Sequence, residues 1–249
     1  MAAQFYWLNE RSQGFLNAGY MPEGVTPKQR IRDIANRAEE LSGIEGFSDK
    51  FYDYMARGFY SLSSPVWANY GTDRGMPVSC FGSYIDDNMA SIVFTQAEVA
   101  FLSILGGGTS GYMGALRPRG APITDNGQSS GAAHFTELFE VLTKIVSQGS
   151  VRRGFYAPYF PIDHDDFDEI MQFRERHNPI QKLTFGINVT DDFMDRLLNC
   201  DPEAERRWEK VVRKRFETGV PYIFFEDNVN NNKPEVYKDK GNYIYASNM

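Results

Sequence analysis

Apolar residues in the first sixty positions recur at the spacing of an amphipathic helix. In PKQRIRDIANRAEELSG, Ile31 and Ile34 fall on one helical face. Thr26 stands where an N-cap is expected, directly before a proline that suits the first helical turn. FSDKFYDYMARGFYSL repeats the pattern, with Ser48 as its predicted cap. Residues 1–60 are therefore predicted to form a helical region, to which we assign no chemistry.

From residue 61 onward, short apolar runs typical of strands alternate with segments of helical periodicity. SSPVWANYGTDRGMPVSCFGSYIDD is interpreted as two strands joined by a turn-rich loop, with Cys80 in or at the end of the second strand. Further strands are predicted in GFYAPYFPI, KLTFGINVT and PYIFFED, and another begins in NYIYASNM. The predicted helices are MASIVFTQAEVAFLSI, AHFTELFEVLTKI, DHDDFDEIMQFRER, DDFMDRLLN and EAERRWEKVVRKRFETG. This alternation predicts an α/β fold with a parallel sheet and crossover helices.

Two glycine-containing segments with nearby arginines interrupt this alternation. GGGTSG, residues 106–111, is either a tight turn after a helix or a ligand-binding loop, and it lacks the lysine of a P-loop. The long polar loop that follows carries Arg117 and Arg119, and SQGSVRRG carries Arg152 and Arg153. Glycines beside arginines favour backbone and guanidinium contacts with phosphates, so we interpret the region as a nucleotide site.

Cys80 is the candidate reactive group. A cysteine in a strand is usually an inert side chain, but Ser79 and the Gly/Pro-rich approach put this one at a strand end, where α/β sites form. A thiol there can act as a nucleophile or as half of a redox pair. Cys200 has the sequence context of a surface or packing residue, so a redox partner for Cys80 is expected from outside this chain.

Composition restricts the classes of partner. A formal net charge of −7 argues against sequence-independent nucleic-acid binding, and no apolar stretch approaches the length that crosses a bilayer. Two cysteines do not make a disulfide framework, and the N-terminus does not resemble a signal peptide. The three histidines lack metal-ligand spacing, so no metal site is expected. We expect a soluble protein of a reducing cytoplasm, with neither membrane nor nucleic acid as a partner.

The order of the motifs resembles one family. SSPVWANYG, PVSCFGSYIDD, GGGTSGYMGALRPRGAPI, SQGSVRRG, PYIFFEDN and YASNM are similar, in that order, to the catalytic large subunit of ribonucleotide reductase, most of all the class I form from bacteria and their viruses. The resemblance implies an α/β fold in which an N-terminal helical region, residues 1–60, precedes the first half of a ten-stranded α/β barrel, residues 61–249. It also implies radical-based reduction of ribonucleotides to deoxyribonucleotides, with allosteric control of specificity.

The resemblance implies roles for individual residues at the substrate. Cys80 corresponds to one of the two thiols that reduce the ribose and form a disulfide in each turnover. Asn248 corresponds to the asparagine that hydrogen-bonds a ribose hydroxyl beside the radical cysteine. Contacts with the substrate are implied for Ser64, Ser79, Gly107 and Gly108.

The resemblance also implies an effector site and several partners. The site for a deoxynucleoside triphosphate or ATP would contain Asp87, Arg117 and Ile123. The loop between effector and substrate would consist of Ser147, Gln148, Gly149, Ser150, Val151, Arg152 and Arg153. No cofactor is expected to bind this chain directly. A small subunit with a diiron or other metal centre would supply the radical, thioredoxin or glutaredoxin would be the reductant, and two large subunits would form a homodimer through the effector site.

The sequence departs from the family pattern at its end. Met249 stands where the family continues into the radical cysteine and a catalytic glutamate. We hypothesise that a second polypeptide, the C-terminal half of the large subunit, completes a split ribonucleoside-diphosphate reductase that is inactive as this chain alone. A split-intein junction or a truncated sequence would also produce an end at this position. The alternative functions are a non-catalytic nucleotide-binding or regulatory fragment and the N-terminal piece of a cobalamin-dependent class II reductase.

Overall fold

The computed structural model describes residues 5–125, 127–148 and 152–248. Contacts divide the chain into two compact units, Met1–Ser79 and Cys80–Met249. The boundary expected after residue 60 differs from this division, because Trp67 packs in the core of the first unit. As a boundary between functional domains, it stays a prediction.

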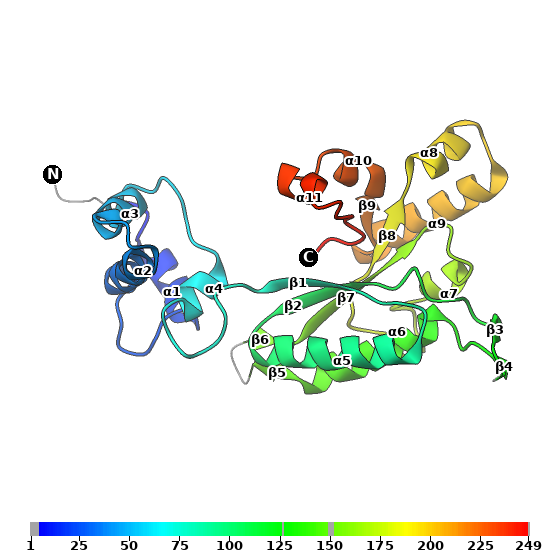
Figure 1. Cartoon of the computed structure of the whole chain (residues 1–249), viewed down its shortest axis with the longest axis horizontal. Helices are drawn as coiled ribbons and strands as arrows, with labels where there is room; N and C mark the ends of the chain where they lie inside the picture. Colours follow the sequence, from blue (N-terminus) through cyan, green and yellow to red (C-terminus); the bar gives the residue numbers. More distant parts are fainter. Residues whose placement is uncertain (1–4, 126, 149–151, 249) are drawn as a thin grey trace. The chain divides into compact units, whose positions relative to one another are not determined.

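In its described residues, the first unit has four helices around an aromatic-rich core (Figure 1). They are α1 (Glu10–Asn17), α2 (Pro27–Ser42), α3 (Phe47–Ala56) and α4 (Ser64–Asn69). The predicted cap at Thr26 is confirmed, since its hydroxyl accepts a hydrogen bond from the Gln29 amide at 3.2 Å. The predicted cap at Ser48 is wrong. Gly46 precedes α3, and the Ser48 amide instead donates to a Glu39 carboxylate oxygen at 2.7 Å.

Residues 64–69 form α4 and not the predicted strand. Pro65 lies in the first turn, where its fixed φ suits a helix. The buried guanidinium of Arg30, from α2, donates to three main-chain carbonyls at the end of α4 over distances of 2.7 to 3.3 Å. The last carbonyls of a helix lack partners in the next turn, so a residue remote in sequence helps to stabilise the end of α4.

The second unit is built on a parallel sheet with the strand order β1-β2-β7-β8-β9 (Figure 1). Its strands are β1 (Cys80–Tyr84), β2 (Gly108–Tyr112), β7 (Phe155–Pro161), β8 (Gly186–Val189) and β9 (Tyr222–Phe225). The helices between them are α5 (Met89–Ile104), α6 (Ala132–Ile145), α7 (Phe167–Ile170), α8 (Asp191–Leu198) and α9 (Pro202–Thr218), and α10 (Glu226–Asn231) and α11 (Glu235–Asp239) follow the last strand. Parallel strands joined by helices confirm the predicted α/β fold.

Short antiparallel hairpins lie in two of the connections. β3 (Pro122–Ile123) pairs with β4 (Gly127–Gln128) between β2 and α6, and β5 (Ser147–Gln148) pairs with β6 (Arg152–Arg153) between α6 and β7. The strand predicted in NYIYASNM is wrong for its described residues, 242–248, which have no regular secondary structure and belong to no sheet.

Strand β2 was missed because its sequence, GTSGY, has the composition of a turn. The structure explains its glycine at position 111. A Cβ added there would collide with the hydroxyl of Tyr156 on the neighbouring strand β7. β2 is paired on both sides, with β1 and with β7, so its neighbours impose the extended backbone that its own residues do not favour.

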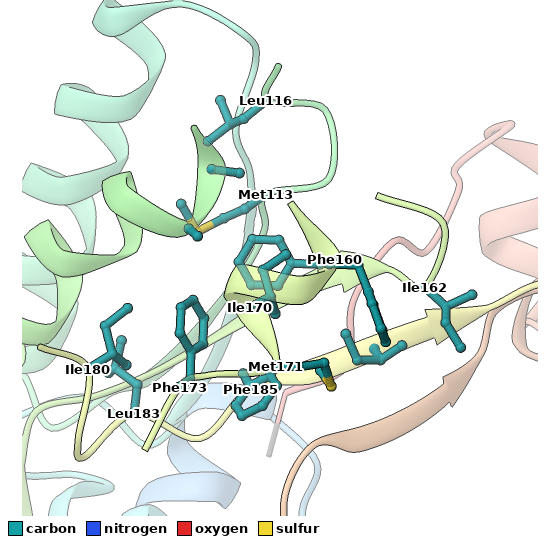
Figure 2. Packing of buried hydrophobic residues seen from close by; sticks show 14 of the residues in the cluster. Met113, Leu116, Phe160, Ile162, Ile170, Met171, Phe173, Ile180, Leu183 and Phe185 are labelled. Carbon is teal, nitrogen blue, oxygen red and sulfur yellow. The ribbon is translucent and has the colours of Figure 1, made fainter. Parts of the chain in front are cut away.

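The two faces of the sheet are buried differently. One face of the sheet, called the outer face below, is covered by helices α5, α6, α8 and α9, with a large apolar core between them and the strands. Part of this core is drawn in Figure 2. The opposite face is called the inner face. The inner face carries a smaller cluster formed by Ala157, Tyr159 and Phe224, with Ile244 and Ala246 of the C-terminal segment packed against it. The inner face is therefore the side on which the polar site described below is assembled.

Candidate functional site

Cys80 is the first residue of β1 and is exposed. It pairs with Gly108 of β2, which in turn pairs with Phe155 of β7. Side chains alternate along a strand, so Cys80 lies on the same face as Tyr84, which contacts Tyr112 and the C-terminal segment on the inner face. The expected position at a strand end is confirmed, but it is the amino end of the strand and not the carboxyl end, where open α/β sheets usually bind ligands.

Asn248 lies beside Cys80 although 167 positions separate it from Phe81. Its side-chain amide donates to the carbonyls of Phe81 at 2.7 Å and Gly108 at 3.0 Å. Both carbonyls belong to the amino ends of β1 and β2. The structure thus brings together the predicted reducing thiol, the predicted ribose-binding asparagine and one of the two predicted ligand-binding glycines.

The other glycine of that pair, Gly107, has a structural reason to lack a side chain. A Cβ there would come within 2.9 Å of both the Leu102 carbonyl oxygen and a ring carbon of Phe81. The Gly107 amide is also engaged, since it donates to the Leu102 carbonyl at 2.7 Å. Packing at the end of α5 therefore accounts for Gly107, and its contact with a ligand stays a prediction.

Ser64 and Ser79 belong to the first unit. Ser64 begins α4 and lines a cavity of about 780 Å³, together with aromatic residues that include Tyr60 and Trp67. Ser79 is half-buried and directly precedes Cys80 in the chain. Their contacts with a substrate stay predictions.

The residues predicted for the effector site converge at the opposite end of the sheet. Asp87 follows β1, and Arg117 follows β2, so both lie beyond the carboxyl ends of the strands. The Arg117 backbone amide and guanidinium donate to the two Asp87 carboxylate oxygens at 3.1 and 2.7 Å. A second guanidinium nitrogen donates to the Pro122 carbonyl at 2.7 Å, next to the exposed Ile123 of β3. The structure therefore brings Asp87, Arg117 and Ile123 together.

The predicted specificity loop coincides with the hairpin of β5 and β6. In the backbone, Ser147 pairs with Arg153 and Gln148 pairs with Arg152, while Gly149, Ser150 and Val151 lie outside the described residues. The hairpin directly precedes β7, so it lies at the amino end of the sheet, the end that also carries Cys80. Within one chain, it lies at the opposite end from Asp87 and Arg117.

Three polar residues near the C-terminal segment were missed by sequence reasoning. Asn188 lies in the apolar strand β8, and Glu226 and Asn230 lie on α10 directly after the apolar strand β9. All three are buried and hydrogen-bonded to the segment that carries Asn248. The sequence did contain signals for these residues. Asn188 interrupts the apolar strand GINV, and Glu226 directly follows the apolar run YIFF, and buried polar groups require specific partners.

The surrounding tyrosines have perturbed ionisation. Burial is the main cause that raises the pKa of Tyr112, and the nearby Glu226 carboxylate raises it further. Burial also raises the pKa of Tyr243, and so does its hydrogen bond to Glu226. Both phenols therefore remain protonated near neutral pH. They are hydrogen-bond donors and aromatic packing surfaces there.

The described residues contain neither a metal centre nor a membrane span. Among them, no cluster of three or more histidine, cysteine, aspartate or glutamate side chains has a geometry that could hold a metal ion. Among the helices that the structure describes, none has the length and apolar character needed to span a bilayer.

Comparison with known proteins gives consistent matches. A family model, "Ribonucleotide reductase, barrel domain", matches residues 78–205. The alpha subunit of a class Id ribonucleotide reductase from Actinobacillus ureae superimposes with a TM-score of 0.92 at 46% identity, over 100% of this chain and 46% of that chain. The ribonucleoside-diphosphate reductase large subunit of Invertebrate iridescent virus 6 is 27% identical over 92% of this chain and 25% of its own length. A vitamin B12-dependent ribonucleoside-diphosphate reductase from Thermoplasma acidophilum is 26% identical over 87% of this chain and 30% of its own length. The chain thus spans less than half of each relative.

Proposed function

This chain belongs to the ribonucleotide reductase family, and on that premise we propose that it forms the part of a large subunit that carries one reducing thiol and the effector-specificity loops. The observation that carries the proposal is the position of Asn248, which is hydrogen-bonded to the strand ends beside Cys80. A hydrogen-bonding group for a ribose hydroxyl and a reducing thiol are two of the groups that reduction of a ribose needs, and this end of the sheet carries candidates for both.

The proposed reaction uses Cys80 only in its reductive step. A cysteine thiyl radical from another part of the complete enzyme removes the 3′ hydrogen of the ribose, and the 2′ hydroxyl leaves as water. Cys80 and a second cysteine then supply two electrons and two protons and become a disulfide, which an external dithiol reduces again. The 3′ hydrogen returns to the ribose, and the thiyl radical is regenerated. The exposure of Cys80 supports this role, because the disulfide must reach both substrate and reductant.

We further propose the partners that this chemistry needs. A small subunit with a metal centre supplies the radical, as is consistent with the class Id relative, although vitamin B12-dependent relatives also exist. Thioredoxin or glutaredoxin serves as the dithiol reductant, and a deoxynucleoside triphosphate or ATP binds at Asp87, Arg117 and Ile123. The reaction takes place in the cytoplasm, which for a viral enzyme is that of the host.

The proposal also includes a homodimer that forms through α5 and α6. Both helices expose large apolar side chains, among them Phe94 (74% exposed), Phe101 (70%) and Ile145 (76%). α5 begins beside Asp87 and ends near β5, so it links the two ends of the sheet. In an antiparallel pair of copies, the β5–β6 hairpin of one copy lies near Asp87 and Arg117 of the other, which joins the effector site to the specificity loop.

The test is a Cys80→Ser substitution in the complete reductase that contains this chain. We expect multiple turnover to be lost while nucleotide affinity stays within about twofold, because a hydroxyl cannot replace the thiol as an electron donor. Cys200→Ser is the matched control, since Cys200 is exposed in the turn between α8 and α9. A Cys80→Ser enzyme that completes many turnovers would contradict the proposal.

A further inference from the structure

Among the residues that the structure describes, none pairs as a strand with the segment that carries Asn248. Within residues 243–248, Ile244 and Ala246 pack against the inner face of the sheet, and none of these residues joins its hydrogen-bond ladder. A sliding shift by one residue would displace Asn248 by roughly 3.3 Å, which is enough to break its bonds to Phe81 and Gly108. The position of Asn248 must therefore be set by other contacts of this segment.

Asn188 of β8 binds the backbone of the segment. Its side-chain amide donates to the Tyr245 carbonyl at 2.7 Å and to a Glu226 carboxylate oxygen at 2.8 Å. The side chain is 1% exposed, and its own carbonyl oxygen has no hydrogen-bond partner among the described residues. Leaving a buried oxygen unsatisfied is unfavourable, so the two donated bonds are the reason for an amide at this position.

Glu226 connects Asn188 to the start of the segment. One of its carboxylate oxygens accepts from Asn188, and the other accepts from the Tyr243 hydroxyl at 2.9 Å. Both bonds are to a charged acceptor, and such bonds are stronger than bonds between neutral groups. Glu226 therefore orients the Asn188 amide and holds the Tyr243 side chain at the same time.

Asn230 lies one turn after Glu226 on α10 and binds Ile244, the residue between Tyr243 and Tyr245. Its amide donates to the Ile244 carbonyl at 2.9 Å, and its carbonyl accepts from the Ile244 amide at 2.9 Å. This reciprocal pair reproduces what a neighbouring strand would provide. Tyr243, Ile244 and Tyr245 are thus each held by a different buried side chain, and the Tyr245 ring also packs on Tyr84 at 4.8 Å.

We propose that Asn188, Glu226 and Asn230 are positioning residues of the reductase reaction, which fix the register of residues 243–248 and thereby place Asn248 beside Cys80. The effect on turnover rests on the proposed function. The effect on the position of residues 243–248 can be measured without turnover. Each of the three is hydrogen-bonded to residues 243–245, so they act through the segment.

Hydrogen exchange in the complete reductase tests the structural half. In Asn230→Ala, the Ile244 amide loses its acceptor, and we expect its exchange to accelerate at least about tenfold, as hydrogen-bonded amides exchange through local opening. Asn228→Ala is the matched control, because Asn228 lies exposed on the same helix. Unchanged exchange at residues 243–248 in Asn230→Ala would overturn the proposal.

Steady-state kinetics test the functional half. In Asn230→Ala and in the milder variants Glu226→Gln and Tyr243→Phe, we expect kcat to fall about three- to thirtyfold while KM and effector affinity stay within about twofold, since the group that is misplaced acts in the chemical step. Glu235→Gln, at an exposed glutamate of α11, should leave kcat unchanged. A purely structural role would instead lower the fraction of active enzyme and leave the kcat of folded molecules intact.

Asn248→Ala separates failure of the inference from failure of the proposed function. Loss of turnover in Asn248→Ala together with normal kcat in all three network variants would overturn the positioning role. Normal turnover in Asn248→Ala would overturn the function proposed for Asn248, and it would also remove the kinetic effect expected of the network. If Asn230→Ala fails to fold, the milder variants Glu226→Gln and Tyr243→Phe carry the test.

Discussion

Among single residues, Gly111 and Tyr156 illustrate how tightly the centre of the sheet is packed. Tyr156 is fully buried and stacks on Phe139 of α6, with ring centroids 4.2 Å apart. Its hydroxyl finds no partner in the described part of the chain, and burial raises its pKa, so it stays protonated. Gly111 leaves room for that hydroxyl. Gly111 gives β2 the composition of a turn, and the reason for this glycine is a residue on another strand, far along the chain.

This pair gives a prediction for stability. Gly111→Ala should destabilise the protein by about 1–3 kcal/mol through the collision of its methyl group with the Tyr156 hydroxyl. Tyr156→Phe should change stability by less than about 1 kcal/mol, because the hydroxyl that it removes is unsatisfied. The double variant should recover much of the loss. Urea-induced unfolding of the single and double variants measures this, and strictly additive effects would contradict the steric explanation.

Among the elements, Arg117 connects three segments at the carboxyl end of the sheet. It joins the loop after β1, the loop after β2 and the start of β3 through its bonds to Asp87 and Pro122. The Arg117 and Asp87 side chains are both about one-third exposed, so the ion pair itself adds little stability. Under the proposed function, this arrangement presents the Arg117 guanidinium to a phosphate of the effector.

Arg117→Ala should therefore weaken binding of the effector far more than binding of the substrate. A charge-assisted contact is worth about 1.5–3 kcal/mol, which corresponds to a loss of effector affinity of roughly tenfold or more. Equilibrium binding of a deoxynucleoside triphosphate and of the substrate measures the two effects. Arg213→Ala, at an exposed ion pair on α9, is the control. Equal losses at both sites would show that the loop is wrongly assigned.

For the molecule as a whole, the exposed apolar face of α5 and α6 points to association between copies. The ends of these helices lie next to the Asp87–Arg117 pair and next to the β5–β6 hairpin, which are proposed here as effector site and specificity loop. Under the proposed function, dimerisation through this face would bring the two groups together across the interface.

Phe101→Glu should convert the dimer of the complete enzyme into monomers at micromolar concentration, since a buried unpaired charge is strongly unfavourable. Phe216→Glu is the matched control, because Phe216 is 91% exposed on α9, away from that face. Sedimentation velocity distinguishes the two. The monomeric variant should also lose the dependence of substrate preference on effector. A dimeric Phe101→Glu enzyme would exclude this face as the interface.

Several features could be predicted from the sequence because their signals are local. The periodicity of residues 27–42 and the cap at Thr26 predicted α2, and apolar runs predicted β7, β8 and β9. The order of the motifs was sufficient to identify the family. The same local reasoning failed at α4 and β2, where Arg30 and Tyr156, both remote in sequence, decide the conformation.

The α/β class and most helices and strands thus follow from the amino-acid sequence alone, since each depends on neighbours within a few positions, whereas the candidate residues come from the resemblance of the motifs to the family. The folded chain was needed to show that Asn248 lies beside Cys80, that Asp87 contacts Arg117 at the opposite end of the sheet, and that Asn188, Glu226 and Asn230 hold the C-terminal segment. These contacts join residues far apart in the chain, and their geometry depends on how the strands pair and on which polar groups become buried together. No local pattern of hydrophobic and polar residues encodes that pairing.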